Sequence, residues 1–164
     1  MAKKPSGTPA LRALDAARVA YTVREYVHDP RAVSFGLEAA AALGLPPGRV
    51  FKTLLASDGR QLVVGIVPVD RTLDLKALAV ALGLKKLAMA DPAAAERSTG
   101  MVVGGISPIG QKRALPTVLD ASAVEYDTVL VSGGRRGLDI ELAPANLVRL
   151  TAATVHPIAD RKAT

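Results

Sequence analysis

Three places in this sequence carry residues that suit chemistry on a small bound molecule. In the stretch "TGMVVGGISPIGQKRALP", the adjacent Gly104 and Gly105 end an apolar run. Glycine there marks a bulge or a close approach of the main chain to another group, and main-chain N–H groups aimed at a substrate can stabilise an oxyanion. Lys52 and Asp139 each interrupt an apolar strand. Lys52 is a candidate cation for binding phosphate or hydroxyl groups, and Asp139 is a candidate carboxylate for orienting a neighbouring group. The glycine loop is therefore a candidate pocket wall.

Each of these residues also has a purely structural explanation, which is favoured over a functional one when the residue types alone are considered. The glycine pair can be a bulge at a strand end, and a lysine in a half-exposed strand usually faces solvent. Asp139 can simply point outward, and the arginines of "GGRRG" form either a charged hairpin tip or a phosphate contact. These positions alone therefore do not identify a function.

The composition excludes several kinds of chemistry. The chain has no cysteine and two histidines, His28 and His156, so a protein thiolate is excluded and a zinc site has a poor ligand supply. The glycine loop lacks the lysine and Ser/Thr pair of a P-loop and the spacing of a dinucleotide fingerprint. No nucleophile elbow surrounds Ser107 or Ser132. We predict an activity without metal or cofactor.

Length and charge indicate one globular domain with an anionic partner. The 164 residues are 49% hydrophobic and 22% charged, which predicts a single domain over residues 1–164. The net charge of +6 favours a polyanionic partner. No apolar run reaches the length of a membrane span, and the N-terminal lead-in has no apolar core of a signal peptide, so we predict no membrane and a cytoplasmic location.

The elements that must position these residues can be read from caps, turns and periodicity. Helices are expected from Pro9 behind the cap Thr8, then over 35–44, 73–83, 92–98 and 144–151. Strands are expected over 21–27, 49–57, 61–69, 85–90, 117–122, 128–134 and 138–143, with Asp58-Gly59 as a hairpin turn and a frayed tail from residue 160. Helices scattered among strands predict an α+β fold with a mixed, mostly antiparallel sheet.

Several motifs in a fixed order then narrow the assignment. The segments "EYVHDP", "VFKTLL", "VGGISPIGQK", "LPTVLD" and "VSGGRRGLDIEL" resemble the YbaK family of Cys-tRNA(Pro) deacylases, relatives of the editing domain inserted in bacterial prolyl-tRNA synthetases. The resemblance runs from about Thr8 to the last helix. It implies a partly barrel-like sheet with helices packed around it. One departure is Ala114 in "GQKRALP", where the family often has a third basic residue.

The resemblance implies trans-editing, the hydrolysis of the ester in mischarged Cys-tRNA(Pro). Cysteine is close to proline in size, and a synthetase pocket rejects a near-isostere poorly, so a second site must sort the products. The family's mechanism resembles substrate-assisted catalysis, in which the thiol of the bound cysteine attacks the ester. That explains why no protein nucleophile is needed. The implied partners are mischarged tRNA(Pro) and prolyl-tRNA synthetase.

The resemblance also assigns site residues. It implies that the loop main chain holds the ester and its oxyanion, that Lys52 anchors the terminal adenosine or its phosphate, and that Asp139 orients the loop or the amino group. The implied catalytic residues are Lys52, Gly104, Gly105 and Asp139. The implied substrate-binding residues are Tyr26, Phe35, Thr53, Ile106, Ser107 and Pro108.

Two other functions stay open at this point. A deacylase of Ala-tRNA(Pro), or of several small aminoacyl-tRNAs, would use the same motifs. A non-catalytic protein that binds tRNA or a synthetase would use the basic surface alone.

Overall fold

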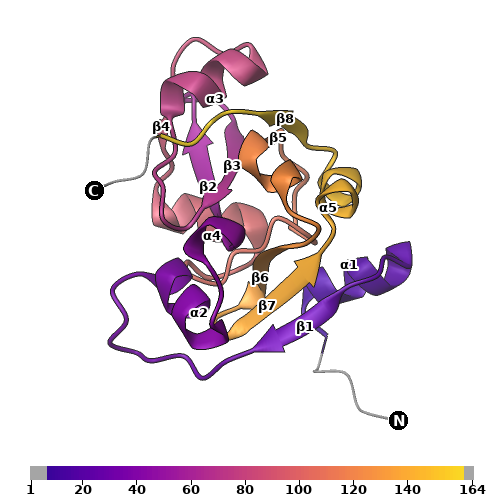
Figure 1. The fold of residues 1–164 in the computed structure, drawn as a ribbon. Helices are drawn as coiled ribbons and strands as arrows, with labels where there is room; N and C mark the ends of the chain where they lie inside the picture. Colours follow the sequence, from indigo (N-terminus) through magenta and orange to yellow (C-terminus); the bar gives the residue numbers. More distant parts are fainter. Residues whose placement is uncertain (1–6, 161–164) are drawn as a thin grey trace.

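The structure, a computed structural model, describes residues 7–160 and consists of helices packed around two β-sheets (Figure 1). The predicted N-terminal lead-in and C-terminal tail fall largely on residues 1–6 and 161–164, outside the described residues. The α-helices are α1 Pro9–Ala17, α2 Phe35–Leu43, α3 Leu75–Leu82, α4 Pro92–Thr99 and α5 Pro144–Thr151. The strands are β1 Thr22–Glu25, β2 Phe51–Ser57, β3 Leu62–Pro68, β4 Ala88–Met89, β5 Thr117–Asp120, β6 Val129–Arg135, β7 Leu138–Leu142 and β8 Thr154–His156.

Local capping explains where the helices begin and end. The Thr8 hydroxyl accepts a hydrogen bond from the Leu11 N–H at 3.2 Å, and Ser34 caps α2 in the same way. Helices α2 and α3 end at glycines in the left-handed conformation, Gly44 with φ +67° and Gly83 with φ +70°. Among the described helices, none has both the length and the apolar character needed to cross a membrane.

The strands form one three-stranded and one five-stranded sheet. The first has the order β1-β7-β6 and is antiparallel throughout. The second has the order β4-β2-β3-β5-β8, in which β3, β5 and β8 pair in parallel and the others are antiparallel. The predicted α+β fold with a mixed sheet is confirmed. A parallel bridge between Val50 and Leu130 joins the two sheets, and barrel-like closure beyond this junction is not confirmed.

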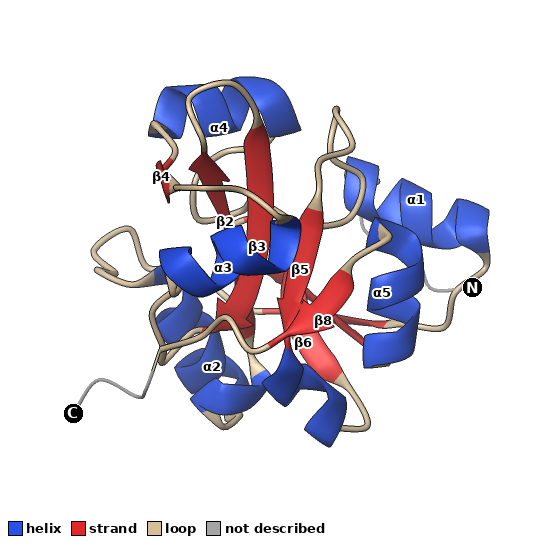
Figure 2. Cartoon of the chain, turned by 90° about the horizontal axis from the view of Figure 1, so that it is seen from above, coloured by secondary structure: helices blue, strands red, loops and turns tan. Residues whose placement is uncertain are grey.

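The core explains why the second sheet has nearly continuous apolar strands. One apolar cluster lies between the sheets and α1, with Ile66, Leu119 and Ile140 fully buried in it. A second cluster packs α3 on the opposite face of β3 and β5 through Leu78. Figure 2 shows helices around several sides of the strands. Because β3 is covered on both faces, its sequence does not alternate.

Some predicted boundaries differ from the structure. The strand expected over 85–90 is only the two-residue β4, and the strand expected over 117–122 ends at Asp120. The Asp120 carboxylate accepts a hydrogen bond from the Ser122 N–H at 3.2 Å, which starts a 3-10 turn instead. Strand β8 was not expected from the sequence, because its three residues are exposed and carry no apolar alternation.

Candidate active site

A cavity of about 400 Å³ lies where α2, β2, β4, the start of α4 and the glycine loop come together. This volume falls within the range of small-molecule sites. Seven of the ten residues singled out from the sequence line it: Tyr26, Phe35, Lys52, Thr53, Gly104, Ile106 and Asp139. The fold therefore brings together residues that are more than a hundred positions apart in the chain.

Strand register places Lys52 and Asp139 in one row with Ser132. The parallel bridge joins Val50 to Leu130, so Lys52 and Ser132 each lie two residues further along neighbouring strands. Ser132 is in turn the antiparallel partner of Asp139. All three line the cavity, which puts a cation, a hydroxyl and a carboxyl on its wall.

Burial shifts the proton equilibria of the polar groups in this wall. It raises the pKa of the Asp139 carboxyl from 3.8 to about 7, and the residue is 6% exposed. Burial also raises the pKa of Tyr26 to about 12, and the charge of Asp139 adds to this shift. Burial lowers the pKa of the Lys52 ammonium, opposed by the charge of Asp70. Asp139 therefore changes its charge near neutral pH.

The glycine loop turns sharply where it meets the cavity. The Gly105 N–H donates to the Val102 carbonyl oxygen at 2.8 Å, so residues 102–105 form a β-turn. Gly104, the third residue of this turn, has φ +87°, which identifies a type II turn and favours glycine. Within residues 7–160, the N–H groups of Gly104 and Ile106 donate to no protein acceptor. Two residues that line the cavity therefore carry main-chain donors without a protein partner.

Three predicted residues support the loop but do not line the cavity. A β-carbon at Gly105 would lie 2.7 Å from the Arg135 Cα atom, so this glycine permits close packing on the main chain at the end of β6. Ser107 is fully buried, and its hydroxyl accepts a hydrogen bond from the Ile109 N–H at 3.2 Å. Pro108 is buried beside it. These three buried residues therefore support the conformation of the loop without contacting the cavity.

The structure adds two residues that sequence reasoning missed. Ser132 lines the cavity beside Asp139, and Met89 lines it while remaining 50% exposed. Ser132 directly precedes the glycines of "VSGGRRG", which is a sequence signal that could have drawn attention to it. Its position beside Asp139, however, depends on the register between β6 and β7. Over the described range 7–160, no cluster of three or more His, Cys, Asp or Glu residues is arranged to hold a metal ion.

The fold and the cavity together define a class of protein. It is an α+β domain in which main-chain N–H donors, a lysine and a buried carboxyl belong to residues that line one cavity. Residues 31–150 match the family model described as the aminoacyl-tRNA editing domain. The chain belongs to this family, which confirms the resemblance found in the motifs and the predicted enzyme class, an aminoacyl-tRNA ester hydrolase.

Individual relatives agree with this assignment. The chain is 40% identical over 92% of its length, and 93% of the relative, to an Enterococcus faecalis protein named "Putative Cys-tRNA(Pro)/Cys-tRNA(Cys) deacylase EbsC". A crystal structure of "a putative trans-editing enzyme for prolyl tRNA synthetase" matches with a TM-score of 0.81 and 26% identity, covering 97% of this chain and 99% of that one. A Moorella thermoacetica proline–tRNA ligase is 36% identical over 44% of this chain, which is 13% of the ligase.

Proposed function

We propose that this chain hydrolyses the ester of mischarged Cys-tRNA(Pro) in trans, within the cavity beside the glycine loop. The observation that carries the proposal is the pair of free N–H groups, at Gly104 and Ile106, in the same cavity as Lys52 and Asp139. The similarity to the Enterococcus faecalis protein over nearly the whole chain supports cysteine as the amino acid.

In the proposed reaction the substrate supplies its own nucleophile. The cysteine sulfur attacks the ester carbonyl carbon, the bond from that carbon to the ribose oxygen breaks, and the thiol proton ends on the ribose hydroxyl. The four-membered thiolactone that results is hydrolysed by water to free cysteine. A thiol with a pKa of about 8.5 is partly ionised near neutral pH, and intramolecular attack can reach effective molarities of roughly 10⁵ to 10⁸ M.

The protein groups hold the substrate in position for this attack. The free N–H groups of the glycine loop bind the carbonyl oxygen as it gains negative charge. Asp139 orients the substrate ammonium, an assignment that its place on the cavity wall favours over a contact with the loop. Lys52 binds a hydroxyl or phosphate group of the terminal adenosine.

The chemistry of the side chain, more than its size, separates cysteine from alanine in this proposal. Alanine is smaller than cysteine, so a cavity that admits cysteine also admits alanine and rejects it weakly. Alanine has no nucleophile with which to cleave its own ester. The two other functions, a deacylase of Ala-tRNA(Pro) or several small aminoacyl-tRNAs and a non-catalytic tRNA or synthetase binder, therefore make different predictions.

A panel of charged tRNAs tests the proposal directly. Purified protein is mixed in excess with Cys-, Ser-, Ala- and Pro-tRNA(Pro), and loss of each ester is followed in single turnover. We expect rapid loss of Cys-tRNA(Pro), loss of Ser-tRNA(Pro) at least about a hundredfold slower because a hydroxyl is a weak nucleophile, and no loss of Ala-tRNA(Pro). Rapid serine release would indicate an activated water, and rapid alanine release the broader deacylase. No hydrolysis of any ester would favour the binding protein.

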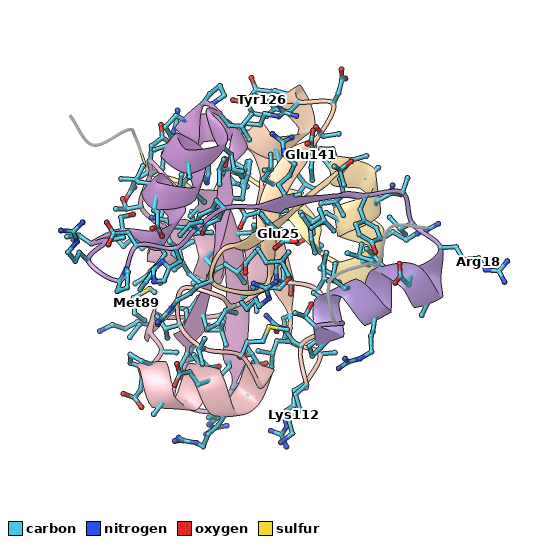
Figure 3. The ribbon with its side chains drawn as sticks, turned by 90° about the horizontal axis from the view of Figure 1, so that it is seen from below. Arg18, Glu25, Met89, Lys112, Tyr126 and Glu141 are labelled. Carbon is cyan, nitrogen blue, oxygen red and sulfur yellow. The ribbon has the colours of Figure 1, made fainter. Side chains whose placement is uncertain are left out.

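Prolyl-tRNA synthetase is a candidate partner, with the cytoplasm as the proposed location. The chain carries a net charge of +6, and Lys112 extends from the surface after the glycine loop (Figure 3). Such charges attract a tRNA backbone without reading its sequence. If the synthetase supplies selectivity, hydrolysis rates for Cys-tRNA(Pro) and Cys-tRNA(Cys) will converge when it is omitted and diverge when it is added.

A further inference from the structure

The two peptide groups that flank Val103 are held by two charged side chains that the proposed chemistry does not use. Arg136 donates two hydrogen bonds to the Val103 carbonyl oxygen, from Nε at 3.0 Å and Nη2 at 2.6 Å. The Glu96 carboxylate accepts a hydrogen bond from the Val103 N–H at 2.8 Å. Arg136 comes from the turn between β6 and β7 and Glu96 from α4, so the contacts tie the glycine loop to two separate elements.

The orientation of the peptide between Val103 and Gly104 decides which group faces the cavity. Type I and type II turns differ mainly by a flip of the central peptide, which here joins Val103 to Gly104. A trans peptide carries its C=O and N–H on opposite sides, so holding the Val103 oxygen at Arg136 directs the Gly104 N–H the other way. After a flip, the cavity would receive a carbonyl oxygen in place of a donor.

Phe35 also contacts Arg136. The guanidinium carbon lies 4.6 Å from the centre of the Phe35 ring, a cation–π contact. The same ring packs against Gly104, where an added β-carbon would lie 2.8 Å from it and 2.9 Å from the Arg136 Nε. Arg136, Phe35 and Gly104 therefore form one packed unit at the edge of the cavity.

We propose that Arg136 is a positioning residue for the ester site, which selects the type II turn and so keeps the Gly104 N–H aimed at the substrate carbonyl oxygen. The inference rests on the proposed function, because only an ester in this cavity gives that N–H its role. It does not require Arg136 to touch the substrate.

The competing role for Arg136 is direct binding of tRNA phosphate, since its side chain is exposed. The neighbouring Arg135 offers a matched control. It carries the same charge and is the last residue of β6, directly before Arg136. Its Nη2 lies 3.8 Å from the Glu25 Oε2 in an ion pair, and within the described residues it makes no hydrogen bond to the loop. Arg135→Ala and Arg136→Ala therefore each remove one positive charge that could attract tRNA phosphate. Only Arg136→Ala also removes the hydrogen bonds to the Val103 carbonyl oxygen.

The kinetic test compares kcat and KM for Cys-tRNA(Pro) hydrolysis in these two variants and in Arg136→Lys. We expect kcat of Arg136→Ala to fall roughly tenfold to a hundredfold, less than the hundredfold to thousandfold loss typical of deleting an oxyanion donor. Arg135→Ala is expected to keep kcat within about twofold of wild type, consistent with an exposed charge. Arg136→Lys, with a single donor centre, should lie between them, and added guanidinium should partly restore kcat of Arg136→Ala only. A raised KM with unchanged kcat in Arg136→Ala would overturn the proposal in favour of phosphate binding.

A measurement without substrate separates this proposal from the proposed function. In ¹⁵N- and ¹³C-labelled protein, release of the turn should move or double the Gly104 amide and Val103 carbonyl resonances in Arg136→Ala and leave them in place in Arg135→Ala. Unchanged resonances would show that Arg136 does not select the turn, whatever the enzyme does. If wild type hydrolyses no Cys-tRNA(Pro) while the resonances move, the proposed function fails and the turn selection stands. If Arg136→Ala does not fold, Arg136→Lys provides the same two readouts.

Discussion

Gly104 and Phe35 are in such close contact that a β-carbon on Gly104 would lie 2.8 Å from two atoms of the aromatic ring. Gly104 also has φ +87°, a conformation that other residues adopt at a cost of roughly 1–2 kcal/mol. The contact and the backbone angle both oppose any side chain at this position. The ring and the loop therefore determine each other's place at the cavity.

Gly104→Ala should reduce catalysis far more than stability alone explains. The alanine displaces the Phe35 ring or flips the turn, and either change misdirects the Gly104 N–H. We expect kcat for Cys-tRNA(Pro) to fall at least about a hundredfold, as for loss of an oxyanion donor. The matched control is Gly59→Ala, since Gly59 has φ +95° with no atom within 4 Å of an added β-carbon. It should lose roughly 1 kcal/mol of stability and keep its kcat. Equal kcat losses in both variants would argue against a role for the loop.

Gly105→Ala should act through packing. Its β-carbon would meet the main chain of Arg135 and Arg136 at 2.7 to 2.8 Å, and backbone cannot move aside as a side chain can. We expect the free energy of unfolding to fall by about 1–3 kcal/mol, measured by urea denaturation. Gly48→Ala is the control, because its β-carbon meets only the hydroxyl at the end of the Tyr126 side chain, at 3.1 Å. A Gly105→Ala protein as stable as Gly48→Ala would contradict the tight packing described for the loop.

Asp139 should make folding stability depend on pH below neutrality. Its pKa is about 7 in the fold against 3.8 for the free group, so the folded state binds more protons between these values. Stability from this group is complete below about pH 3.8 and is lost as pH rises through 7. At 1.36 kcal/mol per pKa unit the full loss is on the order of 4 kcal/mol.

The Asp139→Asn variant tests this dependence. Urea denaturation at pH 5 and pH 8 should show wild type losing stability relative to the variant at the higher pH, since asparagine does not titrate. Parallel pH profiles for the two proteins would mean that the Asp139 carboxyl is not shifted by burial.

Lys52→Ala should weaken the handling of tRNA at least as much as the chemical step. The lysine lines the cavity, where burial lowers its pKa, and replacing it removes the amino group proposed to bind the terminal adenosine. We expect kcat/KM for Cys-tRNA(Pro) to fall at least about tenfold, the range of a charge-assisted hydrogen bond. Lys76→Ala on α3, which removes an equal charge from an exposed position, should change it by less than about twofold. Wild-type rates in Lys52→Ala would show that its assigned role is wrong.

Much of the fold could be predicted because it depends on short-range physics. Some features are caused by residues only a few positions away in the chain. They are the helix caps at Thr8 and Ser34, the hairpin of β2 and β3, and the helix-ending glycines Gly44 and Gly83. Strand β8 was missed because parallel pairing with β5 and two hydrogen bonds to Asp120 from the Ile158 and Ala159 N–H groups hold this segment. The residues of β8 themselves show no hydrophobic periodicity from which these contacts could be predicted.

By itself, the sequence determined which reactive side chains the protein has and predicted which residues form the site. The absence of cysteine and the order of the motifs led to Lys52, Gly104 and Asp139, and all three line one cavity. Tertiary structure alone decided that Ser132 lines the same cavity and that Gly105 packs on the main chain of Arg135. It also decided that Arg136 donates a hydrogen bond to the carbonyl oxygen of Val103, 33 residues earlier in the chain. Those facts depend on strand register and on contacts between distant segments, which local propensity and residue spacing do not specify.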